Sequence, residues 1–212
     1  VNPSAPDELV LTMIGAQASV ASAGILLLYD RVGSIASLPI GGATGTTAVS
    51  TSIGRYITEG TQLIAEVVGS SVVTSTAPVF SISKYTNQDG TTLRNTGQIT
   101  GYTIGNTAIG RIYPAFSFFL PLQAGDTGVR SVEEYTLHTA NATAAAKLNI
   151  VFAKPLCYLP LNPTANVWVE RDMVLQTVRL PRVYDDACLA FAVMNGSTGN
   201  PVIFGNLVGA MG

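Results

Sequence analysis

Charged side chains are scarce in this sequence, since Asp, Glu, Lys and Arg make up 11% of its 212 residues, whereas a soluble domain carries roughly 25%. Hydroxyl residues replace them, with 15 Ser and 23 Thr beside 21 Gly. The AVILMFWYC set still reaches 47%, which is enough apolar matter for a core and argues against disorder. Because surface charge is what usually keeps a monomer soluble, we expect the chain to lie against other protein surfaces.

A basic excess and a long apolar run are also missing. The formal net charge is −2, so no positive footprint for nucleic acid exists. The apolar runs, such as residues 24–29, are far shorter than the ~20 residues that cross a bilayer. The sequence shows no charged segment that is followed by an apolar stretch and a cleavage site, which is the pattern of a signal peptide. We therefore expect neither nucleic acid nor a membrane as a partner.

Cysteine and histidine are nearly absent. Cys157 and Cys188 stand alone in apolar stretches, which favours buried free thiols over a disulfide and lacks the paired spacing of a metal site. A hydrolytic triad would have to use His138, the only histidine, for which a structural hydrogen bond is the better interpretation. No nucleophile elbow, P-loop or dinucleotide fingerprint occurs. The sequence predicts a non-enzymatic protein without cofactor or metal; two distant, facing carboxylates would leave a glycan hydrolase as an alternative.

Short apolar runs rich in Val, Ile, Thr and aromatics alternate with clusters of Gly, Asn, Thr and Pro, which is typical of strands. Convincing helix signals are scarce; for residues 7–18 we prefer strand to helix, and for the Ala-rich residues 139–148 helix competes with a turn. The pattern predicts an all-β fold, an antiparallel β-sandwich or jelly-roll-like single domain over residues 9–212. The expected strands cover residues 9–14, 24–29, 63–68, 78–83, 98–104, 116–120, 129–137, 147–152, 173–180 and 188–194.

Two segments are candidates for binding other subunits. Residues 1–8 hold two prolines and little to bury, which predicts an extended attachment arm, with a frayed terminus as the equal alternative. Tyr158 and Trp168 flank a stretch broken by prolines, and such residues favour interfaces over a position above the core. The predicted interface residues are Val1, Asn2, Pro3, Ser4, Ala5, Pro6, Tyr158 and Trp168.

Four stretches carry a family resemblance. They are LLYDR at 27–31, YTNQDGT at 85–91, PLQAGDTGVRSVE at 121–133, and ERDMVLQ at 170–176 leading to LPRVYD at 180–185. Together these stretches resemble virion structural proteins of tailed bacteriophages, and the match runs from about residue 15 to residue 191.

The resemblance implies a capsid-associated decoration or cement protein located in the virion. Such a protein binds across subunits of the major capsid protein and stabilises the head. It is expected to form a homo-oligomer, with a trimer as the preferred state. The alternative is another virion component: a major capsid subunit, a vertex protein, or a tail fibre or receptor-binding module.

Overall fold

The computed structural model describes residues 9–21, 24–69, 77–100, 112–113, 117–176, 180–195 and 202–211. The predicted all-β class is confirmed, because antiparallel strands dominate and the described residues contain a single helical turn. The sequence suggested one domain over residues 9–212, whereas the structure groups the chain into two compact units. Unit 1 combines the chain up to Asp30 with the chain from Pro155 onward, and unit 2 is the continuous segment Arg31–Lys154.

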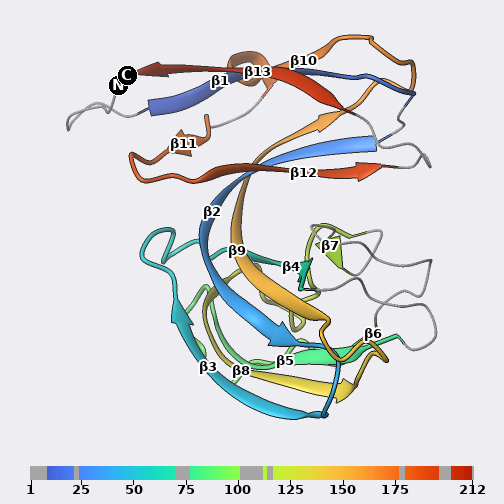
Figure 1. The fold of residues 1–212 in the computed structure, drawn as a ribbon. Helices are drawn as coiled ribbons and strands as arrows, with labels where there is room; N and C mark the ends of the chain where they lie inside the picture. The colour runs from blue at the N-terminus through green and yellow to red at the C-terminus, as the bar shows by residue number, and fades with distance from the viewer. Residues whose placement is uncertain are drawn as a thin grey trace. The chain divides into compact units, whose positions relative to one another are not determined.

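Unit 1 consists of two antiparallel layers (Figure 1). In the first layer β1 is central, with β13 along one side and β10 and β11 along the other. In the second layer, β12 pairs with the first half of β2, from Gly24 to Asp30. The bounds are β1 Leu9–Ala18, β2 Gly24–Pro39, β10 Val169–Asp172, β11 Arg182–Val183, β12 Leu189–Asn195 and β13 Ile203–Met211.

The core of unit 1 is small and aliphatic. Its buried residues are Leu11, Ile14, Ala16, Leu26, Leu28, Cys157, Leu159, Leu161 and Met173. The Cys157 thiol lies 3.6 Å from the Met173 sulfur, and both cysteines are free, as predicted. The expectation that both are buried is wrong for Cys188, which is exposed because it lies in the loop before the outer strand β12.

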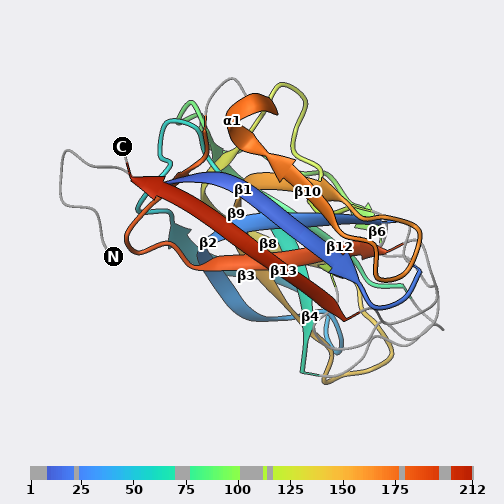
Figure 2. The ribbon, with the colours of Figure 1, turned by 90° about the horizontal axis from the view of Figure 1, so that it is seen from above.

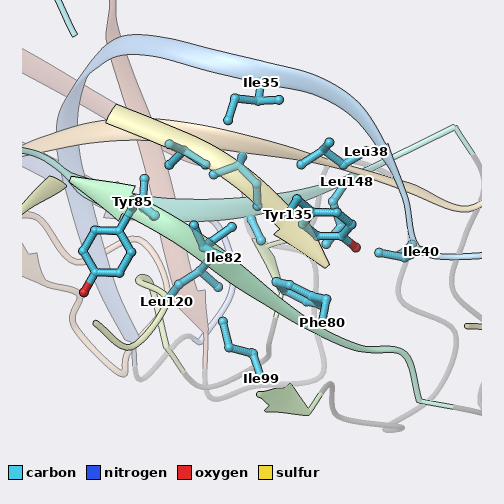
Figure 3. Packing of buried hydrophobic residues seen from close by; sticks show 14 of the residues in the cluster. Ile35, Leu38, Ile40, Phe80, Ile82, Tyr85, Ile99, Leu120, Tyr135 and Leu148 are labelled. Atoms are coloured by element: carbon cyan, nitrogen blue, oxygen red, sulfur yellow. The ribbon is translucent and has the colours of Figure 1, made fainter. Parts of the chain in front are cut away.

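Unit 2 contains a four-stranded sheet in the order β3-β8-β5-β6, and β4 pairs with both β7 and β9. These strands are β3 Gly45–Ser52, β4 Gln62–Val68, β5 Val79–Asn87, β6 Ile99–Thr100, β7 Ile112–Tyr113, β8 Val129–Thr139 and β9 Lys147–Pro160. The sheets enclose a larger core than that of unit 1 (Figure 3). Within it the Phe80 and Tyr135 rings lie 5.8 Å apart, and the Tyr135 hydroxyl donates to the Pro39 carbonyl at 2.9 Å.

Most expected strands are present, but two expectations are wrong. Residues 173–180 were expected to form a strand, yet α1 (Met173–Gln176) begins there because the Asp172 carboxylate accepts hydrogen bonds from the amides of Val174 and Leu175. Residues 117–120 form bends instead of a strand, with the Ser117 side chain bonded to the backbone of Phe119.

Two regions whose structure the sequence left open are resolved in the structure. Residues 9–18 form β1, so strand was the right preference over helix. The Ala-rich stretch makes a turn before β9, in which the Ala146 amide donates to the Thr143 carbonyl.

Candidate protein-binding surface

The single histidine makes a hydrogen bond in unit 2. Its Nε2 atom lies 3.0 Å from the hydroxyl of Ser81, a residue on the neighbouring strand β5. Within the described part of the chain, His138 hydrogen-bonds only to Ser81, so no carboxylate orients the imidazole. A hydrolytic triad needs that third group, and the pair therefore matches the structural hydrogen bond that the sequence predicted.

Two of the four resemblance stretches meet at one buried carboxylate, Asp126. Its Oδ1 atom accepts from Asn87 and Arg94 at 2.8 and 2.9 Å. Its Oδ2 atom accepts from the Tyr85 hydroxyl at 2.5 Å and from Arg94 Nε at 2.9 Å. The Tyr85 oxygen in turn accepts from the Gln123 amide at 2.8 Å. This network joins the end of β5 to the loop 121–128. The two resemblance stretches at 85–91 and 121–133 therefore serve to hold this loop in place.

The electrostatics of this network fit the same interpretation. Burial alone would raise the pKa of Asp126, but hydrogen bonds from Arg94, Asn87 and Tyr85 lower it to about 2. Burial and the bond to Asp126 raise the pKa of Tyr85 to about 12. An acid fixed in its ionised form and a phenol fixed in its neutral form are poor proton carriers near neutral pH. These hydrogen bonds therefore hold the loop 121–128 against the end of β5.

The turn at residues 87–91 belongs to the same region. The Asn87 side-chain oxygen accepts from the amides of Asp89 and Thr91, and Gly90 has a φ of 84°. This geometry is that of the tight turn expected from Asp-Gly. In the parts of the chain that the structure describes, no group of three or more His, Cys, Asp and Glu could hold a metal ion. The same residues include no helix long and apolar enough to span a bilayer.

Exposed apolar side chains are concentrated in unit 1. Of sixteen large apolar residues exposed in the described chain, Ile57 and Leu93 belong to unit 2, and the other fourteen belong to unit 1. We call these fourteen the apolar set. They are Val20, Ile25, Tyr158, Val167, Trp168, Val174, Leu175, Leu189, Phe191, Val202, Phe204, Leu207, Val208 and Met211.

Trp168 lies on the outer face of the β1 layer. It precedes β10, and its ring lies against the backbone of Gly15 in β1, with Asn206 of β13 beside it. Its Nε1 atom lies 3.4 Å from a Glu170 carboxylate oxygen. The side chain is 42% exposed, so the ring has one face on the sheet and one face toward solvent.

Two further residues of this outer face are apolar. Phe204 and Val208 of β13 alternate with Asn206, and residues two apart on a strand share a face. Both are exposed. A large, half-buried aromatic ring with exposed apolar neighbours is the usual chemistry of an interface centre.

The other predicted interface residues have different positions. Tyr158 is 39% exposed but belongs to β9, outside the β1 sheet. In the stretch between Tyr158 and Trp168, the side chains of Leu159 and Leu161 are buried in the core of unit 1. This stretch therefore combines core residues with the exposed Tyr158 and Trp168 at its ends. The six arm residues from Val1 to Pro6 lie outside the described residues.

Sequence reasoning missed the exposed apolar residues of β13 and Phe191 of β12. A signal was available, because residues 201–212 contain no charged side chain. Comparisons with protein-family models, with curated proteins and with solved structures find no match to this chain.

Proposed function

We propose that this chain is a non-enzymatic structural protein of a tailed-phage virion, a decoration or cement protein that binds across major capsid protein subunits. The observation that carries the proposal is the concentration of the apolar set in unit 1. Exposed apolar side chains that share one face, as Trp168, Phe204 and Val208 do, mark an interaction site. The resemblance of the four sequence stretches supplies the class of partner.

The proposed mechanism is mechanical. Burying apolar surface contributes about 25 cal/mol per Å², and a binder that contacts only the assembled lattice stabilises that lattice by mass action. Low charge serves this purpose, because apolar side chains such as Trp168 can be covered without desolvating many ions. Unit 2 contributes a separate, well-packed core and few exposed apolar groups.

A binding assay on depleted heads tests the proposal. Heads are purified from a phage whose gene for this chain is deleted, and the full chain is added and co-sedimented with them. We expect saturable binding, with Trp168→Ala raising the apparent Kd at least ~30-fold, the ratio that corresponds to a loss of about 2 kcal/mol. Ile57→Ala, which truncates an exposed apolar side chain of unit 2, is the matched control and should bind as the wild type does.

Absence of binding to depleted heads, or equal binding by Trp168→Ala and wild type, contradicts the proposed role of this surface. Copy number in purified virions then separates the alternatives. Hundreds of copies agree with decoration of the shell, whereas a few to a few dozen indicate a vertex or tail component.

A further inference from the structure

Strand β13 has one open edge. Among the described residues it pairs only with β1. The other side of β1 is taken by β10, as Figure 2 shows, and by β11. Proteins usually protect such edges with charge, proline, a covering segment or short length. β13 is nine residues long, its sequence IFGNLVGAM contains no charge and no proline, and eight of its residues are exposed. This edge is therefore suited to accept another strand.

The direction of the backbone groups identifies the pairing positions. The Val202 carbonyl accepts from the Ser19 amide, and the Val208 carbonyl accepts from the Thr12 hydroxyl. The backbone N–H and C=O groups of even-numbered residues therefore point toward β1. Because these groups alternate along a strand, those of the odd-numbered residues point away from β1, toward the open edge. The residues with outward backbone groups are Ile203, Gly205, Leu207, Gly209 and Met211.

We propose that two copies of this chain associate by antiparallel pairing of β13 with β13 about a two-fold axis at Leu207. Leu207 is the midpoint of β13, so this is the register in which all nine residues are paired. Each outward-facing residue then meets another outward-facing residue, which allows about ten backbone hydrogen bonds.

The side chains of β13 complement themselves in this register. Gly205 lies opposite Gly209 of the second copy, and Phe204 opposite Ala210, so a large ring meets a small side chain. In an antiparallel pair opposite residues share a face. The remaining pairs are Ile203 with Met211, Asn206 with Val208, and Leu207 with Leu207 of the second copy, and none puts one bulky polar group against another.

The absence of charge favours a second copy over an unlike partner. In a two-fold strand pair, a charged residue near the centre would lie close to the same residue of the second copy and be repelled by it. β13 contains no charged residue. An unlike partner would place no such restriction on the sequence. A two-fold contact gives a closed dimer, in which the open β13 edge of each copy is covered by the other copy. This dimer differs from the trimer expected from the sequence. The association needs no capsid and does not rest on the proposed function.

Cross-linking of the full chain tests the register. All variants carry Cys188→Ser to remove the exposed thiol. Opposite residues in a hydrogen-bonded pair have Cα atoms about 5.5 Å apart, within disulfide range, so Leu207→Cys should give a disulfide-linked dimer under mild oxidation. Phe204→Cys is the matched control, because its two copies would lie about 20 Å apart, six residues along the strand. It should not cross-link alone but should do so when mixed with Ala210→Cys.

Sedimentation velocity provides the second readout. We expect a dimer for the wild type and a monomer for Leu207→Pro, which removes an N–H that points away from β1 and so spares the chain's own ladder. If Leu207→Pro fails to fold, the cross-linking result still decides. A wild-type monomer or trimer, or cross-linking of Phe204→Cys alone as efficient as that of Leu207→Cys, overturns the proposal.

Discussion

A Cβ atom on Gly15 would lie 2.3 Å from Cζ2 of Trp168, so the indole ring rests directly on the backbone of β1. The Asn206 side-chain oxygen would lie 2.8 Å from the same Cβ. Only glycine leaves room for this contact, which joins the segment before β10 to the centre of the sheet. The position of the half-exposed ring is thus set by the absence of a side chain on its neighbour.

The first prediction follows from this contact. Gly15→Ala should displace the indole ring and lower the stability of unit 1 by about 1–3 kcal/mol, the usual cost of overpacking. Trp168 is the only tryptophan, so fluorescence should report the change as a red shift and stronger acrylamide quenching. Gly54→Ala is the control, since a Cβ there meets nothing within 4 Å. Identical spectra for Gly15→Ala and wild type would show that the ring does not lie on this glycine.

The second prediction concerns the Asp126 network. Asp126→Asn keeps the side-chain shape but leaves Arg94 without its carboxylate, so unfolding in denaturant should show a loss of about 2–3 kcal/mol. Glu134→Gln breaks the more exposed pair with Lys84 and should cost clearly less, because solvent screens an exposed ion pair. Equal losses in the two variants would contradict the structural role given to Asp126.

The third prediction is a pH dependence with a defined sign. The pKa of Asp126 is about 2 in the folded chain, below its ordinary value of 3.8. Its ionised form therefore stabilises the fold fully above pH ~4, and this contribution, up to about 2 kcal/mol, is lost as the pH falls toward 2. Denaturant unfolding measured across this range should show the loss in the wild type and a smaller one in Asp126→Asn. A wild type and variant with parallel pH profiles would contradict it.

The fourth prediction distinguishes the two thiols. Cys188 is exposed, whereas Cys157 is buried and burial raises its pKa. A thiol reagent should label one cysteine rapidly in the native protein and the second only after unfolding, because the thiolate is the reactive form. Cys188→Ser should abolish the rapid phase. Two rapid phases in the wild type would show that Cys157 is accessible.

Local pattern was sufficient for much of the fold. β4 (QLIAEVV) is rich in β-branched residues, and β9 contains Ile150, Val151 and Phe152 in a row, so their propensity already indicates their state. In contrast, β13 contains Gly205, Asn206 and Gly209, which are poor strand formers. Its state is set by pairing with β1, and such a distant partner cannot be read from local sequence.

The same reason limited prediction of the sites. Asp126, Arg94 and Tyr85 occur in or near stretches that the sequence singled out, but their meeting depends on contacts 32 and 41 positions apart. Trp168 was selected for its residue type and its place beside a proline-broken stretch, and its half-exposed position agrees with the interface prediction without testing it. The contribution of Gly15 depends on a cross-strand neighbour and could not be inferred from spacing.

Unit 2 interrupts unit 1 in the chain, and this order matters for synthesis on the ribosome. The partners of β3, β5 and β8 all lie between Arg31 and Lys154, so this segment can fold while later residues are still being added. In contrast, β1 is made before unit 2, and its partners β10 and β13 are made after unit 2. Nascent chains therefore hold β1 without these partners while all of unit 2 is being made, a period in which chaperones would have the most to protect.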